Sequence, residues 1–379
     1  MTVQDHFDVA VIGGGIAGLS AAANIARGAS VVVLEGESQP GYHSSGRSAA
    51  ILAQGYGSGA MQVLTGLSEP FFNAPPAGFA EAPLLTPRGL MRVAREDQLQ
   101  ALKAVAAQME GRAALAWLTG EEAEARAPLL RPGHIARAFY NPDAADIDVH
   151  GLMQGFLRMA KSAGAEFFGK AEVVSMAPAA QGWRIETAQG VVTAGVVVNA
   201  AGAWADKVAT LAGVRPLGLQ PMRRTAITVA APGDVDVQAM PMIVDADEEF
   251  YVKPEAGKLM ASPGDETPAE PQDAQPEELD VAICVDRVSQ ACRIEVRRIE
   301  SKWAGLRSFF PDRLPACGFD PEAKGFFWLA GQGGAGVQTA PAMGRLAAAL
   351  VLGTPVEEVL ADSGLAPGYI APGRPALAA

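Results

Sequence analysis

Four residues near the start of the chain have the types and the spacing that bind a dinucleotide. Gly13, Gly15 and Gly18 form a Gly-x-Gly-x-x-Gly motif, and an acid, Glu35, follows 20 residues after Gly15. The glycines of such a motif allow a tight turn, a close approach of the backbone to the pyrophosphate, and close packing of a helix on a strand. The carboxylate accepts hydrogen bonds from ribose hydroxyls, which argues against a 2′-phosphate and so against NADP. The sequence therefore predicts a site for FAD or NAD.

The elements that must position these residues lie on either side of the glycines. Residues 9–12 and 31–35 are short apolar runs, which is typical of strands buried on both faces. Between them we expect a helix over residues 15–27 that points its N-terminal N–H groups and dipole at the pyrophosphate. Gly28 is predicted to be a left-handed cap at the end of this helix. Together these elements form one βαβ unit.

A second strand, glycine turn and helix follow near the end of the chain. Residues 326–330 are apolar, residues 331–336 are rich in glycine, and a helix is expected up to about residue 352. Other strands are predicted over residues 90–94, 171–176, 183–187, 190–201, 225–230, 242–245 and 250–253. Other helices are predicted over residues 147–163 and 281–299, and residues 36–48 and 263–280 are predicted to be a polar loop and an acidic connection.

The composition excludes several classes of function. The chain has 379 residues with 30 basic and 42 acidic side chains, and its net charge is −12, so nucleic acid and anionic membranes are not expected partners. The three cysteines have no Cys-x-x-Cys spacing and are expected to be reduced, and no clustered metal ligands are visible, so no metal is predicted. The first strand leaves no room for a signal peptide, and no apolar run has the length of a membrane span, so we predict a cytoplasmic protein without an integral membrane segment.

Several long, irregular segments resemble the FAD-dependent D-amino acid oxidase/dehydrogenase family, whose members include glycine and sarcosine oxidases. They include Gln39–Ala50, Val198–Trp204, Gly213–Pro221 and the run Trp303-Ala-Gly-Leu-Arg-Ser-Phe309, with shorter matches at residues 75–79, 145–148, 325–328 and 332–334. Within the family, the resemblance is strongest to the bacterial D-arginine dehydrogenases. It implies non-covalent FAD as the cofactor and a small amino acid or amine as the substrate partner.

The resemblance also implies a fold and a domain division. The fold class is α/β, with a discontinuous, Rossmann-like FAD-binding domain and an inserted substrate domain made of a mixed or antiparallel β-sheet plus helices. We expect residues 1–54, 146–221 and 323–379 to form the FAD-binding domain. Residues 55–145 and 222–322 are expected to form the substrate-binding domain.

The resemblance further implies which residues contact FAD. The loop Ser44–Ala50 runs along the pyrophosphate and flavin, Val173 meets the adenine, and the helix after Gly334 points its N-terminus at the flavin N1/O2 edge, where it stabilises the anionic reduced flavin. His43 is expected to be a cofactor-shell residue rather than a base. The cofactor-binding residues are predicted to be Gly13, Gly15, Ile16, Ala17, Gly18, Glu35, Gly36, His43, Ser44, Ser45, Gly46, Arg47, Ser48, Ala49, Ala50, Val173, Ala201, Gly202, Gly331, Gly333, Gly334, Ala335, Gly336, Val337 and Gln338.

Oxidation of an amino acid at Cα requires that its carboxylate be held, and arginine is suited to this because its planar fork makes two parallel charge-assisted hydrogen bonds. By resemblance, Arg307 and Arg224 form the clamp with the hydroxyl of Tyr251. Arg223 would point the other way if this segment is a strand. Tyr56, between two glycines, resembles a tyrosine on a mobile lid, and Gly334 completes the predicted catalytic set.

Three positions depart from the D-arginine dehydrogenases. Leu90 stands where they have a Glu that meets the guanidinium, Ile51 stands for a His, and Ala335 stands for a Tyr. All three are expected in the substrate pocket and make it less polar. A buried guanidinium without a partner costs several kcal/mol, so D-arginine is predicted to be a poor substrate.

The predicted reaction is FAD-dependent oxidation of a D-amino acid with an apolar or aromatic side chain. A hydride passes from Cα to flavin N5, and the imino acid hydrolyses to a 2-oxo acid and ammonia. One alternative is a glycine- or sarcosine-type secondary-amine oxidase. Another is a non-catalytic flavoprotein subunit of a complex. The electron acceptor, whether a quinone, an electron carrier or O2, stays open at this point.

Overall fold

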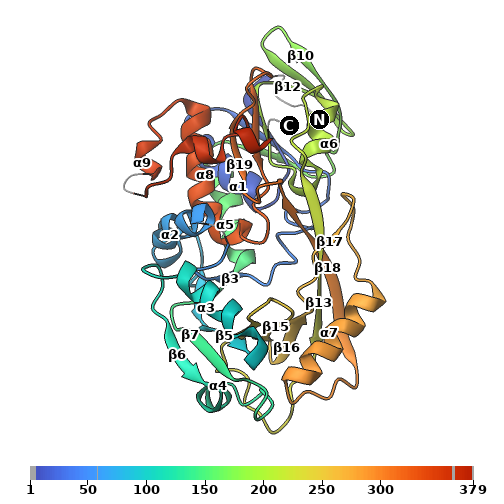
Figure 1. The fold of residues 1–379 in the computed structure, drawn as a ribbon. Helices are drawn as coiled ribbons and strands as arrows, with labels where there is room; N and C mark the ends of the chain where they lie inside the picture. Colours follow the sequence, from blue (N-terminus) through green and yellow to red (C-terminus); the bar gives the residue numbers. More distant parts are fainter. Residues whose placement is uncertain (1–5, 58, 361–362, 378–379) are drawn as a thin grey trace.

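The computed structural model describes residues 6–57, 59–360 and 363–377, which form two large parts stacked on each other (Figure 1). The upper part in Figure 1 is built on an eight-stranded sheet and the lower part on a nine-stranded sheet. The helices are α1 Ile16–Ile25, α2 Gly59–Asn73, α3 Leu99–Gln108, α4 Gly120–Arg126, α5 Val149–Ser162, α6 Ala205–Leu211, α7 Glu278–Ala291, α8 Gly336–Leu352 and α9 Glu357–Leu360.

The first sheet contains the predicted dinucleotide unit. Strand β1 pairs in parallel with β2 and with β12. Strand β12 also pairs in parallel with β20, and β2 with β9, so five neighbouring strands of this sheet are parallel. The order of strands through the sheet is β10-β11-β12-β1-β2-β9, and β20, which pairs with β12, also pairs with β19. Its strands are β1 His6–Ile12, β2 Val31–Leu34, β9 Glu166–Phe168, β10 Val173–Ala179, β11 Gly182–Thr187, β12 Gly190–Asn199, β19 Ala316–Phe319 and β20 Phe326–Ala330.

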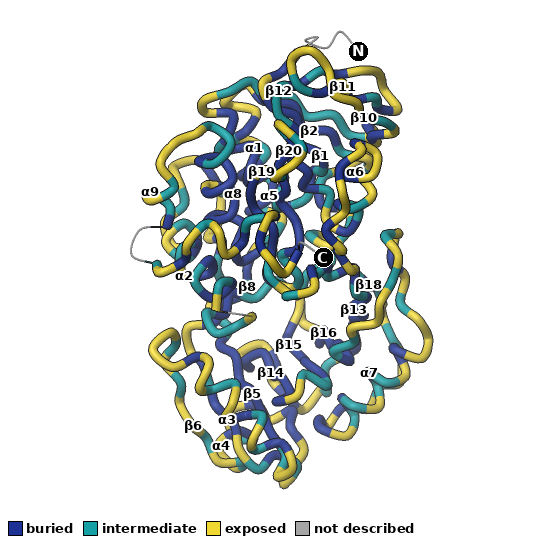
Figure 2. Tube along the Cα trace, turned by 45° about the horizontal axis from the view of Figure 1, so that its top comes forward, coloured by how far each residue is buried: buried dark blue, intermediate teal, exposed yellow. Residues whose placement is uncertain are grey.

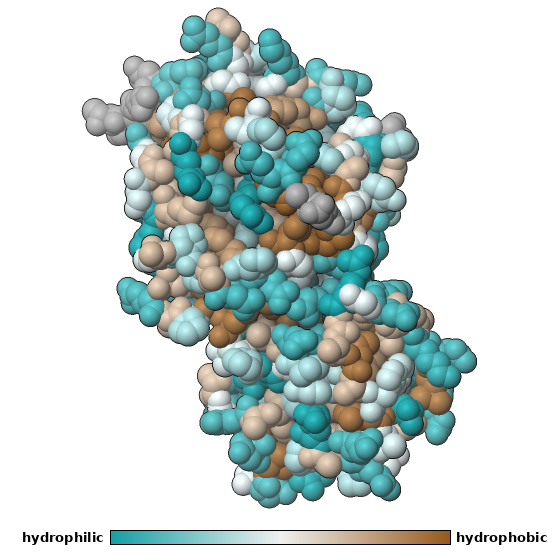
Figure 3. Space-filling view, turned by 90° about the vertical axis from the view of Figure 1, so that its left-hand side faces the viewer, coloured by the Kyte–Doolittle hydropathy of each residue, from teal (hydrophilic) through white to brown (hydrophobic). Residues whose placement is uncertain are grey.

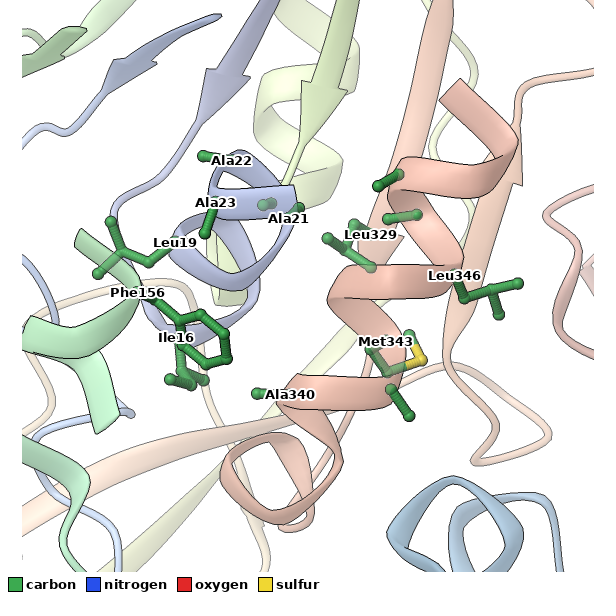
Figure 4. Close-up of a cluster of buried hydrophobic side chains, with 14 of the residues drawn as sticks. Ile16, Leu19, Ala21, Ala22, Ala23, Phe156, Leu329, Ala340, Met343 and Leu346 are labelled. Carbon is green, nitrogen blue, oxygen red and sulfur yellow. The ribbon is translucent and has the colours of Figure 1, made fainter. Parts of the chain in front are cut away.

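Helix α1 lies between α5 and α8 on one side of this sheet (Figure 4). Small residues line this helix, and Ala21, which is fully buried, points toward α8 (Figure 4). The approach is so close that a Cβ on Gly344 of α8 would lie 2.6 Å from the carbonyl oxygen of Ser20. The alanine-rich sequence of α1 therefore sets the distance between these two helices, which both begin at the glycine turns.

The second sheet is mixed and has the order β17-β13-β16-β15-β14-β5-β7-β6, with β18 on the other side of β13. Strands β13 and β18 are long and antiparallel, and they run along the right of Figure 1 between the two parts. The strands are β5 Leu90–Ala94, β6 Ala116–Thr119, β7 Arg137–Asn141, β13 Gln220–Val229, β14 Met242–Asp245, β15 Tyr251–Glu255, β16 Lys258–Ser262, β17 Thr267–Pro268 and β18 Ile299–Phe309. A small third sheet joins β3 Ile51–Leu52, β8 Ala145–Ile147 and β4 Leu85–Pro87 in the order β3-β8-β4.

Burial follows the two sheets. The trace is dark blue along β1, β2 and α1 in the first part and along β14 and β5 in the second, whereas turns and the outer helix α7 carry the exposed stretches (Figure 2). The face drawn in Figure 3 carries several hydrophobic patches with hydrophilic side chains between them. Over the described residues, none of the helices combines the length and the hydropathy that a membrane span requires.

Two sequence predictions about local structure are wrong. The helix predicted over residues 281–299 ends at Ala291, because Arg131 N donates to Ala291 O at 2.9 Å and Arg293 N donates to Leu129 O at 2.7 Å. This backbone pairing takes the chain out of the helix at Cys292, whose backbone is extended. Helix α1 ends at Ile25 with Ala26 in a right-handed conformation, and Gly28 does not have a positive φ. Gly28 instead gives room to Leu352, whose side chain would lie 3.2 Å from a Cβ at that position.

Candidate active site

A large cavity opens where the parallel strands of the first sheet end. The segments that follow β1, β2, β12 and β20 all contribute to its wall, as expected at the carboxyl edge of a doubly wound sheet. They supply residues Ile12, Gly13, Gly15, Ile16, Ala17, Leu34, Glu35, Gly36, Glu37, Ala200, Ala201, Gly202, Ala203, Trp204, Gly331, Gln332, Gly333, Gly334, Gly336 and Val337.

The first glycine turn is as tight as the motif predicts. Gly13 has a φ of +106°, and a Cβ there would lie 2.5 Å from the carbonyl oxygen of Ala200. A Cβ on Gly18 would lie 1.9 Å from the carbonyl oxygen of Gly13, so the helix could not approach the turn with any side chain at that position. Gly18 does not line the cavity, but it allows the N-terminus of α1, which does line the cavity, to pack against the turn.

The carboxylate of Glu35 binds the backbone of two segments of the cavity wall, the glycine turn after β1 and the loop after β2. Its Oε2 accepts a hydrogen bond from Gly14 N at 2.6 Å, and its Oε1 accepts one from Glu37 N at 2.8 Å. A carboxylate has about four acceptor positions, so ribose hydroxyls could still bind to it. The structure therefore gives Glu35 a second role, in ordering the glycine turn, that the spacing of the motif does not reveal.

The loop after β2 is tied to the second part of the molecule. Ser44 Oγ donates to Leu306 O at 2.6 Å, and Arg47 donates to the carbonyl oxygens of Ala274 and Ala304 at 3.0 and 2.9 Å. The Arg47 guanidinium also lowers the pKa of the Asp273 carboxyl by a hydrogen bond. These contacts hold the loop as part of the cavity wall.

His43 and Ser45 of the same loop have distinct neighbours. His43 Nε2 lies 3.0 Å from Glu37 Oε1, and its ring contacts the ring of Trp204 at 4.6 Å between centroids. Ser45 Oγ accepts from Ile16 N at 3.0 Å in the first turn of α1. Gly46 does not line the cavity, since its N–H closes a turn by donating to Gly41 O at 2.9 Å.

Two buried polar groups in the wall have no hydrogen-bond partner among the described residues. They are the hydroxyl of Ser308 and the amide nitrogen of Gln332, and both residues line the cavity. A buried polar group without a partner costs about 1–3 kcal/mol, so such groups mark a place where a bound polar molecule completes the bonding. The flavin and pyrophosphate of FAD carry suitable donors and acceptors. Helix α8, which begins at Gly336, adds a positive dipole end at the same wall, and the residues present therefore fit FAD.

A second, smaller cavity adjoins the first and shares part of its lining. Arg224, Tyr251, Arg307 and Gly334 belong to both, together with Ser48, Ala49 and Val337. The residues that line only the small cavity are Ala50, Ile51, Tyr56, Leu90, Arg92, Met242, Val244, Glu248 and Gln338. The predicted lid, clamp and substrate-pocket residues are thus brought together, apart from Ala335.

Arg307 is held less firmly than the other arginines nearby. Its Nη1 donates to Tyr56 Oη at 3.1 Å, and within the described residues this hydroxyl is its only hydrogen-bond partner. Burial lowers the pKa of Arg307, but the nearby Tyr56, Tyr251 and Glu248 raise it more, so the side chain stays cationic. The guanidinium therefore presents unused donors to the cavity.

Arg224 lies on the same sheet face. In the register of β13 and β18, Met222 pairs with Arg307 and Arg224 pairs with Gly305, so the two arginines are diagonal neighbours. Arg224 Nε donates to Asp265 O at 2.6 Å, and Nη2 lies 3.3 Å from Glu266 Oε1. Its donors are therefore partly used, which makes Arg307 the better candidate for the principal clamp.

Arg223 points away, as predicted from strand alternation. Its side chain bonds Glu277 and Asp280 on the opposite face of the sheet, the latter at 2.8 Å.

Gly334 lies against both Tyr56 and Arg307. A Cβ at Gly334 would be 2.6 Å from Tyr56 Oη and 3.1 Å from Arg307 Nη1. Only a glycine lets these two side chains meet at this edge of the cavity.

The structure corrects the predicted substrate pocket in two ways. Ala335 lines neither cavity, because its side chain packs into the hydrophobic core beside α8 and is only 3% exposed. The pocket is also more polar than Leu90 and Ile51 suggest, because Arg92 and Glu248 line it.

The signals for these two residues differ. Arg92 is two positions after Leu90 on one strand, so alternation could have placed both on one face. Glu248 follows β14 in a turn with a φ of +59°, which nothing in the sequence indicates.

The sequence analysis assigned no role at the site to several residues of the large cavity, including Trp204, Lys207, Ser308 and Gln332. Ala50 and Gln338 lie in the small cavity rather than the large one. Among the residues described, no group of three or more His, Cys, Asp or Glu side chains is arranged to hold a metal ion.

Known proteins resemble this chain in sequence and in fold. Glycine oxidase from Geobacillus kaustophilus (strain HTA426) is 29% identical over 236 residues, which cover 62% of this chain and 61% of that enzyme. Mitochondrial sarcosine dehydrogenase from Mus musculus is 25% identical over 259 residues, covering 64% of this chain and 28% of that enzyme. The crystal structure of glycine oxidase from Geobacillus kaustophilus superposes with a TM-score of 0.83 at 24% identity over 96% of this chain and 99% of that one, and confirms the predicted fold class.

The matched segments span less than two thirds of the length of these two curated relatives. The relatives agree with the family seen in the sequence and leave the narrower resemblance to D-arginine dehydrogenases as a prediction. The sequence family described as "DAO: FAD dependent oxidoreductase" matches residues 8–350, which is most of the chain. The chain therefore belongs to the DAO family of FAD-dependent oxidoreductases, and its cofactor is FAD.

Proposed function

We propose that this protein oxidises the C–N bond of a small amino acid of the glycine or sarcosine type, with FAD as the electron acceptor within the protein. The observation that carries the proposal is the Arg307 guanidinium, which faces the small cavity with one hydrogen bond to Tyr56 and further donors unused. A cation in this state, at the junction with the large cavity, is suited to a substrate carboxylate.

Each residue around the junction has a defined part in this proposal. Arg307 binds the carboxylate with two donors, and Arg224 and the hydroxyl of Tyr251 add charge and a further hydrogen bond. Tyr56 closes over the substrate while keeping its contact with Arg307. When bound, FAD supplies a hydride acceptor at its N5 atom. The protein contributes orientation of the substrate Cα toward the large cavity and exclusion of water from the small one.

The names of the matched relatives support the glycine- and sarcosine-type reading over the D-amino acid reading. The two curated relatives reported above are a glycine oxidase and a sarcosine dehydrogenase. Both hypotheses use the same carboxylate clamp, so the substrate class depends on which groups the rest of the cavity accepts.

A D-amino acid with an apolar side chain is the second candidate. Leu90 and Met242 lie on adjacent strands of the cavity wall in direct register, and Ile51 of β3 packs against the same cluster. This apolar surface would accept an aliphatic side chain at Cα. By the same argument D-arginine stays a predicted poor substrate, although Glu248 gives the cavity one carboxylate.

The test is a substrate panel with the purified FAD-containing protein. Glycine, sarcosine, N-ethylglycine, D-leucine, D-methionine, D-proline and D-arginine are added without oxygen, and the loss of flavin absorbance is followed. The proposal predicts the fastest bleaching with glycine or an N-alkyl glycine. Faster bleaching with D-leucine or D-methionine would transfer the assignment to the second candidate. Failure of every compound would instead favour a non-catalytic flavoprotein subunit.

Other properties stay predictions from the sequence. They are the non-covalent attachment of FAD, the domain boundaries, the roles of the individual cofactor-binding residues, and the cytoplasmic location. Repeating the fastest reaction with O2 and with an artificial quinone would identify the class of electron acceptor.

A further inference from the structure

We propose that Arg92 forms a second carboxylate-binding subsite in the small cavity, with Glu248 as its exchangeable counter-ion, so that the substrates include amino or imino acids with two carboxylates. The inference rests on the proposed function, because Arg307 is taken to hold the first carboxylate. It adds dicarboxylates to the expected substrates, which a purely apolar pocket would not bind.

The position of Arg92 is fixed by strand pairing. Arg92 pairs with Val244 in the parallel register of β5 and β14, and Leu90 pairs with Met242 two positions earlier. Residues two apart on a strand point to the same face, so Arg92 continues the wall that Leu90 begins. The residue lines the cavity and is only 7% exposed, so its guanidinium is largely shielded from bulk solvent.

The hydrogen bonds of Arg92 leave donors unused. A guanidinium has five N–H donors. Within the described residues Arg92 makes only two hydrogen bonds, from Nη1 to Ala246 O at 3.3 Å and from Nη2 to Glu248 Oε1 at 3.2 Å. Both distances lie at the long end of the usual range. Because buried charges are normally paired and well bonded, a buried guanidinium with spare donors at a cavity wall is suited to an anionic ligand.

Glu248 is the more movable partner of this pair. Its side chain is 43% exposed although it lines the cavity, whereas that of Arg92 is 9% exposed. Its backbone has a φ of +59°, a conformation that residues other than glycine rarely adopt. The neighbouring backbone is held by the Asp245 carboxylate, which accepts from Asp247 N at 2.9 Å and from Glu249 N at 3.2 Å. The turn is thus fixed while the Glu248 carboxylate can leave Arg92.

The charges of the cavity favour a dianion. Three guanidinium groups, those of Arg92, Arg224 and Arg307, line it against the single carboxylate of Glu248. Arg224 is already bonded to Asp265 and Glu266. One substrate carboxylate on Arg307 and a second on Arg92 would give each of the other two arginines an anionic partner. Exchange of Glu248 for a substrate carboxylate at Arg92 replaces one anion with another, so the buried guanidinium is never left unpaired.

The test compares two ether ligands that have no amine to oxidise. Oxydiacetate has two carboxylates, and methoxyacetate is the same molecule with one of them replaced by hydrogen. Binding to the FAD-containing protein is measured by calorimetry for the wild type, Arg92→Gln and Glu248→Gln. Arg297→Gln, which changes an exposed arginine paired with Glu295, is the matched control.

The proposal predicts that the wild type and Arg297→Gln bind oxydiacetate about tenfold or more tightly than methoxyacetate. Arg92→Gln should lose this preference and keep its affinity for methoxyacetate. Glu248→Gln should bind oxydiacetate more tightly than the wild type, because the competing carboxylate is gone. If Arg92→Gln fails to fold or to retain FAD, the direction of the Glu248→Gln change decides by itself.

Equal binding of the two ligands by the wild type, or weaker oxydiacetate binding by Glu248→Gln, would overturn the proposal. So would an equal loss of both ligands in Arg92→Gln, since Arg92 would then only maintain the cavity. The proposed function fails separately, if no amino acid bleaches the flavin, and the binding comparison still decides the role of Arg92 in that case.

Discussion

Arg307 Nη1 and Tyr56 Oη lie 3.1 Å apart although 251 positions separate the two residues in the chain. The tyrosine comes from the segment after β3, and the arginine from the long strand β18. Their contact joins the predicted lid to the predicted clamp. The hydrogen bond orients the Arg307 guanidinium and leaves its other N–H donors available for a substrate carboxylate.

The contact depends on the absence of a side chain at Gly334. In Gly334→Ala the new Cβ would lie 2.6 Å from Tyr56 Oη and must displace the tyrosine or Arg307. We expect flavin reduction at least about tenfold slower, because small misplacements of positioned groups cost large factors in rate. Stopped-flow measurement of the reduction rate checks this.

A matched glycine gives the control. Gly66 is inside α2, and a Cβ there would meet no atom within 4 Å. Gly66→Ala should leave the reduction rate unchanged and raise stability by up to about 1 kcal/mol, because alanine favours a helix interior. Equal rates for Gly334→Ala and Gly66→Ala would contradict the arrangement described for the active site.

Glu35 is expected to control FAD affinity through the backbone as well as through the ribose. In Glu35→Gln the charge-assisted hydrogen bonds from Gly14 N and Glu37 N are weakened. Hydrogen bonds to charged groups contribute about 1.5–3 kcal/mol, so we expect FAD to bind roughly tenfold to a hundredfold more weakly. Titration of the apoprotein with FAD, followed by flavin fluorescence, measures the change. An unchanged dissociation constant would show that neither role exists.

The first sheet could be predicted from the sequence because its signals are local. The apolar run before Gly13, the glycine spacing and the acid at residue 35 are set by contacts within one βαβ unit. Predictions failed where a distant segment decided the structure. Residues 292–298 were expected to continue a helix but are not helical, because the backbone near Leu129 and Arg131 pairs with the chain at residues 291–293.

The residues of the candidate site that follow from strand alternation or from the family resemblance could be predicted from the sequence. Arg307, Arg224, Tyr251, Tyr56 and Leu90 do line one cavity, and Arg223 does point away. The polar end of the cavity was missed because the side chain of Glu248 depends on a left-handed backbone held by Asp245. Ala335 was placed wrongly because neighbouring residues at the start of α8 point in different directions. Gly334 and Gly336 line the large cavity, whereas Ala335 between them packs into the core.

The ion pair of Glu248 predicts a pH-dependent stability. Burial raises the pKa of Glu248, but Arg92, Arg224 and Arg307 lower it more, so the folded-state pKa lies below the ordinary value. A carboxyl with a lowered folded pKa stabilises the fold above its unfolded pKa of about 4.3, and this stability is lost as the pH falls through the folded pKa. Because the side chain is 43% exposed, the effect should not exceed about 1 kcal/mol.

Denaturant unfolding of the wild type and Glu248→Gln at several pH values measures this effect. The variant should be less stable near neutral pH, and the difference should disappear in acid. A difference that grows as the pH falls would contradict the lowered pKa.

The three cysteines are expected to be unreactive in the folded protein. Cys284, Cys292 and Cys317 are buried and unbridged, and burial raises the pKa of the Cys284 and Cys292 thiols to about 12. Since the thiolate is the reactive form, a thiol reagent at pH about 8 should modify none of them before unfolding and all of them afterwards. Rapid modification of any cysteine in the native protein would contradict the buried positions.

The central claim is that Arg307 holds a substrate carboxylate beside FAD. The most direct measurement is anaerobic flavin bleaching by the best amino acid of the panel and by the amine that remains when its carboxylate is removed, such as sarcosine and dimethylamine, in the wild type and in Arg307→Met. Loss of a buried charged partner costs about 2–5 kcal/mol, so we predict that kcat/KM falls roughly 30-fold to 3000-fold when either the carboxylate or the guanidinium is removed, while FAD stays bound. Equal bleaching by the two compounds, or an unchanged kcat/KM in Arg307→Met, would contradict the claim.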